Sequence, residues 1–166
     1  ASKGIVNGIS DKKFAPDVSI TRGDFILLLV KTLGLDADFE DNFADVNVDD
    51  YYYEAIGIAK KLGIVLGQGD NLFKPRATIS RQDMMVMVER ALVILNRLNK
   101  ASEITEIERF IDKEQIADYA KASIEALVKE GLIIGNDSRI NPLDNTTRAE
   151  TAIFLYRIYN KYWMGN

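Results

Sequence analysis

The chain has 166 residues and a net charge of −4, with no cysteine and no histidine. The missing cysteines exclude disulfides, thiolate chemistry and most zinc sites, and the missing histidines remove the commonest general base near neutral pH. There is no block of lysines or arginines and no run of about 18 apolar residues, so neither nucleic-acid binding nor membrane insertion is expected.

Three segments of similar sequence divide the chain into motifs at residues 1–34, 43–98 and 110–163, with a polar insert at 99–109. In each motif a glycine-flanked apolar stretch is followed by a proline and then, six residues later, by an arginine. The three arginines are Arg22, Arg81 and Arg148. Repetition on this scale predicts an array of equivalent units that share a core.

The first motif opens at Gly4-Ile5-Val6-Asn7-Gly8, which the other motifs show to be the end of a helix. It therefore resembles the start of an excised fragment. The residue before Pro16 is expected to be extended. A capped helix is predicted at residues 21–33, with Gly34 as its C-terminal stop. Its apolar residues lie on all sides, which is typical of a buried helix.

The second and third motifs each contain two predicted helices. Phe43-Ala44-Asp45 and Phe110-Ile111-Asp112 introduce amphipathic helices, which lysines and a glycine end. A second, largely apolar helix follows each arginine. The predicted ranges are 51–62 and 80–98 in the second motif, and 115–130 and 147–163 in the third. The sequence therefore predicts an all-α fold with negligible strand, in which three equivalent buried helices form a central three-helix bundle with pseudo-threefold symmetry.

Each arginine follows a Ser or Thr and precedes an acid by two positions, the spacing of a capping box. The hydroxyl is expected to accept from a helix N–H, and the acid to reach back. Arginine then occupies the first helical position, where a cation is mildly unfavourable. A guanidinium beside free helix N–H groups predicts a carboxylate-binding site. The structural alternative is that each arginine pairs with an acid, such as Asp45, Asp112 or its own capping acid.

The ordered set of Phe-x-Asp, an aromatic residue, Gly-Ile-Val-x-Gly, Phe-x-Pro and Thr-Arg-x-acid resembles the S-layer homology motif. The resemblance implies a three-pronged spindle whose grooves bind secondary cell wall polysaccharide, often with a pyruvate-ketal sugar. It also implies a secreted protein held at a Gram-positive-type cell wall or S-layer. Only the third motif has the Thr-Arg-Ala-Glu that the family favours.

The resemblance also implies roles for particular residues. The arginines would face the ligand carboxylate, and three glycines would let backbone N–H groups approach the ligand. Two aspartates would hold groove loops or accept sugar hydroxyls, and two tyrosines would stand where the family usually has tryptophan. The residues are Arg22, Arg81, Arg148, Gly8, Gly67, Gly135, Asp45, Asp112, Tyr51 and Tyr119.

Two alternatives stay open. Because the first motif lacks its Phe-x-Asp helix, one groove is either incomplete or completed by a second chain, which would give a homo-oligomer. The repeats could instead be a structural or self-association array with the arginines as internal ion-pair staples. Catalysis is not expected, because no pair of carboxylates stands out. No cofactor or metal is expected either, since the acidic stretch 36–50 lacks the spacing of a calcium loop.

Overall fold

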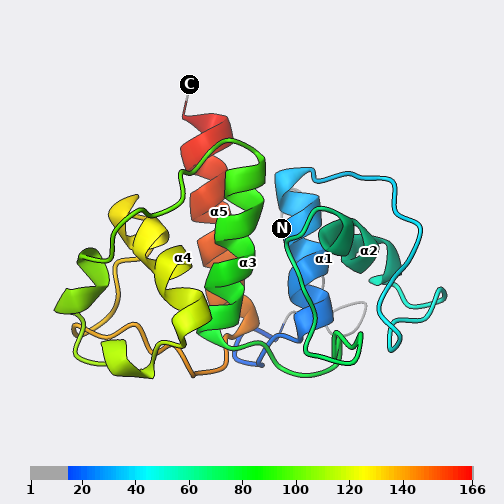
Figure 1. The fold of residues 1–166 in the computed structure, drawn as a ribbon, viewed down its shortest axis with the longest axis horizontal. Coiled ribbons are helices and arrows are strands. Elements are labelled where there is room, and N and C mark those ends of the chain that lie inside the picture. The colour runs from blue at the N-terminus through cyan, green and yellow to red at the C-terminus, as the bar shows by residue number, and fades with distance from the viewer. Residues whose placement is uncertain (1–14, 166) are drawn as a thin grey trace. The chain divides into compact units, whose positions relative to one another are not determined.

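The computed structural model describes residues 15–165, and over that range the chain is helical, with isolated bridges in place of strands (Figure 1). The predicted all-α fold class is confirmed. None of the helices in this range has the length and apolar character needed to cross a membrane. The helices are α1 (Arg22–Leu33), α2 (Tyr53–Lys61), α3 (Arg81–Ile94), α4 (Asp118–Lys129) and α5 (Arg148–Tyr159), with short 3-10 helices η1 (Glu106–Arg109) and η2 (Lys113–Gln115) and a π-helical turn η3 (Asn160–Met164).

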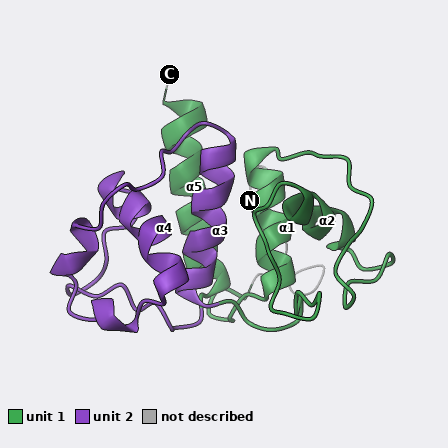
Figure 2. Cartoon of the chain, in the orientation of Figure 1, with its two compact units in different colours: residues 1–79, 146–166 green, residues 80–145 purple. Residues whose placement is uncertain are grey.

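The chain forms two compact units, residues 1–79 with 146–166 and residues 80–145 (Figure 2). In the first unit α1 packs against both α2 and α5, and in the second α4 packs against α3 and η1. The contact between α1 and α5 is the part of the predicted central bundle that lies within one unit. The second motif is divided between the units, because its first helix is α2 and its second is α3.

The predicted helix pattern agrees with the observed burial. In α1, Phe25, Ile26 and Leu29 are fully buried, and the helix ends at Gly34 in the left-handed conformation. The apolar faces of the two amphipathic helices are largely buried too, at Tyr52, Ala55, Ile56 and Ala59 before or in α2, and at Ile116, Ala120, Ile124, Leu127 and Val128 before or in α4. Leu62, predicted on the same face as the α2 residues, is half-buried. These helices gain their stability by burying one face against a neighbouring helix.

Several helix boundaries differ from the prediction. The helix predicted at 80–98 ends at Ile94, because Asn96 takes a positive φ of 54° that reverses the chain. The helix predicted at 115–130 begins at Asp118, since Ile116 is extended after the turn of η2. The helix predicted at 147–163 passes into the wider turn of η3 at Asn160.

A ring of three backbone hydrogen bonds joins the residues two positions before each arginine. The N–H of Ile20 donates to the carbonyl of Thr146 (2.9 Å), that of Thr146 to Ile79 (3.2 Å), and that of Ile79 to Ile20 (3.2 Å). All three residues are fully buried and belong to the first unit. The ring has the threefold relation that the repeats predict.

Candidate functional site

The N–H groups at the starts of α1, α3 and α5 are all used within the protein. In each helix the first two N–H groups donate to two carbonyls of a proline-containing loop from another motif. The donors and acceptors are Arg22 to Ala77 (2.8 Å), Gly23 to Pro75 (2.9 Å), Arg81 to Asp144 (2.9 Å), Gln82 to Pro142 (2.9 Å), Arg148 to Val18 (2.9 Å) and Ala149 to Pro16 (3.1 Å).

The third N–H group of each helix donates to the capping hydroxyl, at 3.2 Å to Thr21, 3.3 Å to Ser80 and 3.2 Å to Thr147. This half of the predicted capping box is confirmed. The expectation of free helix N–H groups beside each arginine is wrong, because loop carbonyls satisfy the groups that a helix start normally leaves without a partner. Any anion bound here would have to be held by side chains.

The arginines of the first two motifs are anchored in the same way. Nε of Arg22 donates to the carbonyl of Phe73 (2.9 Å), and Nε of Arg81 donates to the carbonyl of the equivalent Ile140 (3.1 Å). The guanidinium of Arg22 also lies 4.7 Å from the centroid of the Phe73 ring and is 4% exposed. Arg81 is half-buried. A fixed Nε sets the plane of the guanidinium, which is the part of arginine that recognises a carboxylate.

Arg148 takes part in an ion pair. Its Nη1 lies 3.3 Å from Oδ2 of Asp24 at the start of α1, and Arg148 is 9% exposed. The other oxygen of Asp24, Oδ1, accepts a hydrogen bond from the hydroxyl of Tyr51. Burial and the neighbouring Asp24 carboxylate raise the pKa of Tyr51 above its ordinary value. The cluster therefore joins residues of all three motifs inside the first unit.

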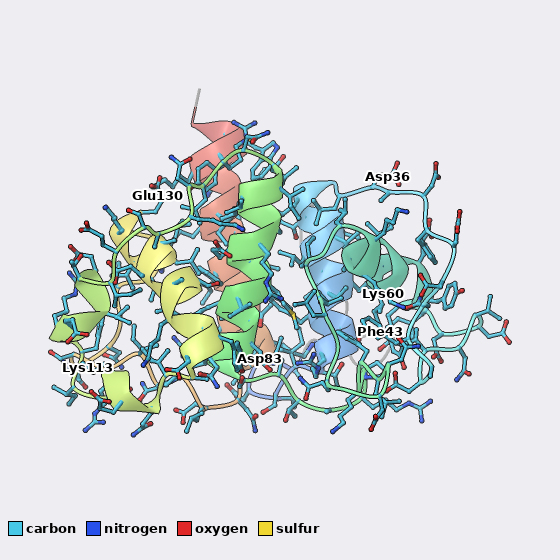
Figure 3. The ribbon with its side chains drawn as sticks, viewed as in Figure 1. Asp36, Phe43, Lys60, Asp83, Lys113 and Glu130 are labelled. Atoms are coloured by element: carbon cyan, nitrogen blue, oxygen red, sulfur yellow. The ribbon has the colours of Figure 1, made fainter. Side chains whose placement is uncertain are left out.

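The second unit repeats the contact between tyrosine and acid. The hydroxyl of Tyr119 donates to Oδ1 of Asp83 (2.5 Å) at the start of α3, the position labelled in Figure 3. The two pairs, Tyr51–Asp24 and Tyr119–Asp83, are called the tyrosine–aspartate pairs below. Sequence reasoning gave both aspartates a capping role, with pairing to an arginine as the alternative, and missed their contacts with the tyrosines.

The acid at the start of α5 behaves differently. The Glu150 carboxylate accepts from the N–H of Thr147 (2.9 Å) and completes the capping box. At α1 the predicted reach of the acid back to its cap is wrong, because the Asp24 carboxylate accepts from Tyr51 and Arg148 instead. Aspartate is one methylene shorter than glutamate, the acid that a capping box normally uses.

The aspartates of the Phe-x-Asp sequences hold loops. Asp45 accepts from the N–H groups of Phe73 (2.8 Å) and Lys74 (2.7 Å). Asp112 accepts in the same way from Ile140 (3.0 Å) and Asn141 (2.7 Å). Lys74 and Asn141 precede proline and have φ of 58° and 53°, a conformation that costs free energy in residues other than glycine. Each aspartate thus holds a strained residue in place.

Packing explains the glycines of the Gly-Ile-Val-x-Gly sequences. Gly67 and Gly135 have φ of 87° and 81°, and a Cβ there would lie 2.8 Å from the ring of Phe43 or 2.5 Å from that of Phe110. The residue before each glycine, Leu66 or Ile134, is exposed. Gly8, the equivalent residue of the first motif, lies outside the described residues.

The predicted site residues of the first unit fall into two groups. Arg22 and Asp45 both hold the loop at Phe73, whose ring stacks on Phe43 with the centroids 5.4 Å apart. Lys60, beside Phe43 in Figure 3, lies 4.8 Å from that ring. Tyr51 and Arg148 meet at Asp24. Within residues 15–165 no cluster of three acidic side chains with a metal-binding arrangement is found.

A family model described as "S-layer homology domain" matches residues 1–26, 42–85 and 109–152. The chain is 31% identical to an amylopullulanase of Thermoanaerobacterium thermosulfurigenes over 97% of its length, and 32% identical to an exoglucanase of Acetivibrio thermocellus over 97%. It is 27% identical to a surface-layer 125 kDa protein of Lysinibacillus sphaericus over 93%. The chain spans only 9%, 15% and 13% of these relatives.

Proposed function

The chain belongs to the S-layer homology family, and we propose that it is a non-catalytic module that binds secondary cell wall polysaccharide without a covalent bond. Such a module would hold an exported protein at the surface of a Gram-positive-type cell. Two observations support an anchoring role. The chain is similar both to glycosidases and to a surface-layer protein, and it covers only a small share of the length of each.

The ligand that we propose is a polymer with carboxylate-bearing sugars, such as a pyruvate ketal. The observation that supports it best is the anchoring of Arg22 and Arg81 through Nε by equivalent loop carbonyls, at 2.9 and 3.1 Å. This bond presets the guanidinium plane for a carboxylate, and a preset donor pays less conformational entropy on binding. Arg81 is the more accessible of the two, so we assign it the leading role.

The test is retention of the purified chain on isolated cell walls. We expect Arg81→Ala to weaken retention by about tenfold, the loss of one charge-assisted contact. Arg139→Ala is the matched control, because Arg139 is an exposed arginine of the same unit, and it should bind like the original chain. Walls stripped of pyruvate should bind both variants equally weakly. Unchanged retention of a folded Arg81→Ala variant would remove Arg81 from the site.

A structural or self-association array is the second candidate, and the ion pair of Arg148 with Asp24 favours it at that position. Arg148 is too buried to be a clean probe of ligand binding. If the arginines are staples, Arg148→Ala should lower the melting temperature and alter the elution volume on size exclusion, while the folded fraction keeps its affinity for walls.

A further inference from the structure

The rings of Tyr51 and Tyr119 are exposed and yet fixed. Tyr51 is 68% exposed and Tyr119 is 58% exposed, and the Tyr51 ring also meets that of Tyr52 edge-on with the centroids 4.7 Å apart. An exposed side chain normally moves among several rotamers. Here the hydroxyl of each tyrosine donates to a carboxylate at the start of a helix in another motif. The hydroxyl is thus tied down while much of the ring faces solvent.

The arrangement occurs in both units. Asp24 follows Gly23 at the start of α1, and Asp83 follows Gln82 at the start of α3. The residue before the aspartate differs, and the bond between tyrosine and aspartate is present in both.

The acids at the three helix starts have different partners. Where the acid is glutamate, at Glu150, its carboxylate is used in the capping box with Thr147. Where it is aspartate, the carboxylate meets the tyrosine instead. The first motif lacks the helix that would supply a tyrosine to Glu150, so the pairs occur at the two helix starts whose neighbouring motif supplies one.

We infer that Asp24 and Asp83 are positioning residues that hold Tyr51 and Tyr119 as rigid stacking surfaces for the apolar face of a sugar ring. The inference deepens the proposed function and rests on it, because it names the residues that would order the aromatic part of a polysaccharide site. A ring that is already ordered loses little conformational entropy when a sugar stacks on it. The two tyrosine–aspartate pairs lie in different units, so each unit contributes one such surface.

The closing experiment separates the ring from its hydroxyl. The double variant Tyr51→Phe/Tyr119→Phe keeps both rings and removes both hydroxyls, and Tyr51→Ala/Tyr119→Ala removes the rings. We expect the phenylalanine variant to bind walls about threefold to tenfold more weakly, the cost of ordering released side chains. The alanine variant should bind at least about tenfold more weakly. Tyr156→Phe is the control, since Tyr156 is 62% exposed and lies on α5; it should bind like the original chain.

Rescue tests the aspartate side. Asp83→Asn keeps an oxygen that can accept from Tyr119 and should bind nearly as well as the original chain, whereas Asp83→Ala should bind like a Tyr119→Phe variant. A spectrophotometric titration adds a readout without any glycan. Asp24→Asn should lower the pKa of Tyr51 toward its ordinary value, because a charged neighbour is removed while Tyr52 and Arg148 remain.

The possible outcomes are distinct. If the original chain is retained on walls and the phenylalanine variant is retained equally, the positioning role is overturned and the proposed function stands. If the original chain is not retained at all, both are overturned. If the phenylalanine variant is weaker but Asp83→Ala is not, the hydroxyl acts directly on the ligand and the positioning role is overturned.

Discussion

The first helices of the two complete motifs differ at one equivalent position, Gly57 in α2 and Glu125 in α4. Each lies six residues before the glycine that follows its helix (63 − 57 = 131 − 125 = 6). A Cβ at Gly57 would lie 2.3 Å from the ring of Phe39. The ring of this linker residue therefore packs directly on the helix backbone at Gly57, where no side chain intervenes.

In α4 the equivalent residue, Glu125, attaches the preceding segment to the helix through its charged side chain. It is only 1% exposed, and its carboxylate accepts from the N–H groups of Glu106 (2.9 Å) and Ile107 (3.0 Å) and from the hydroxyl of Thr105 (3.2 Å). The carboxylate thus caps η1 and fixes the polar insert. Linkers can attach to equivalent helices by unrelated chemistry, whereas the Phe-x-Asp loops of both units keep the same hydrogen bonds.

The largest expected effect comes from removing the charged attachment. Glu125→Ala should lower the free energy of unfolding by about 3 kcal/mol, because the buried N–H of Ile107 and the part-buried N–H of Glu106 lose a charged acceptor. Chemical denaturation measures the loss, and increased proteolysis within residues 99–109 should accompany it. A loss below about 1 kcal/mol would contradict the view that this carboxylate holds the insert.

The pH dependence sharpens the same prediction. Burial raises the pKa of the Glu125 carboxyl, but the N–H groups of Glu106 and Ile107 outweigh burial and hold that pKa below its ordinary value. A lowered pKa means that the contribution is present above the unfolded pKa and is lost as pH falls through the folded pKa. The stability difference between the original chain and Glu125→Gln should therefore shrink as the pH drops below about 4.5.

The glycines should show a smaller effect that is shared by both units. Gly135→Ala would force a Cβ to within 2.5 Å of Phe110 and 2.9 Å of the carbonyl of Arg139, so a loss of about 2 kcal/mol is expected. Gly131→Ala is the matched control, because it has a similar positive φ but no atom within 4 Å of the added Cβ. It should lose about 1 kcal/mol from backbone strain alone. Equal losses in denaturation would mean that the contact with Phe110 does not matter.

An exchange of the residues before proline tests the strained positions. Asparagine tolerates a positive φ better than lysine does. Lys74→Asn should therefore raise the free energy of unfolding by about 0.5 kcal/mol, and Asn141→Lys should lower it by about the same amount. The melting temperatures of the two single variants should move in opposite directions, and movement in the same direction would contradict the argument.

The smallest effect is expected at the bare helix position. Gly57→Ala gains about 1 kcal/mol of helix propensity and displaces the half-buried ring of Phe39, whose packing is worth a similar amount. The net change in the free energy of unfolding should stay within about 0.5 kcal/mol. The fluorescence anisotropy of a label at the neighbouring exposed position, Glu40, should fall. A loss above about 2 kcal/mol would show that Phe39 is held as firmly as the insert at Glu125.

Local sequence rules were sufficient for much of the fold. The Ser and Thr caps, the positions of Arg22, Arg81 and Arg148 at the first turn, and the stop at Gly34 all follow from chemistry within a few residues. The helix ends at Ile94 and Tyr159 were missed, because Asn96 and the π-helical turn carry no strong signal in an apolar run.

The candidate site was harder to predict, since its hydrogen bonds span long stretches of sequence. Asp24 meets Arg148 across 124 residues, and Arg22 meets the carbonyl of Phe73 across 51. No local pattern specifies such contacts. The arginines were therefore placed correctly at the helix starts, but the N–H groups beside them were expected to be free and instead donate to loop carbonyls. One usable signal was present: aspartate replaces glutamate only in the motifs whose neighbour supplies a tyrosine.

The hydrogen bonds at the helix starts make each motif depend on another one. Each arginine-bearing helix receives its first two acceptors from the proline loop of a different motif: α1 from residues 75–77, α3 from 142–144 and α5 from 16–18. A single motif, expressed by itself, would leave the first two N–H groups of its own helix without acceptors and its own loop without a donor. Each folding unit therefore combines the helix of one motif with the proline loop of another. Removing one motif should leave one remaining helix start without its acceptors and one remaining loop without its donors.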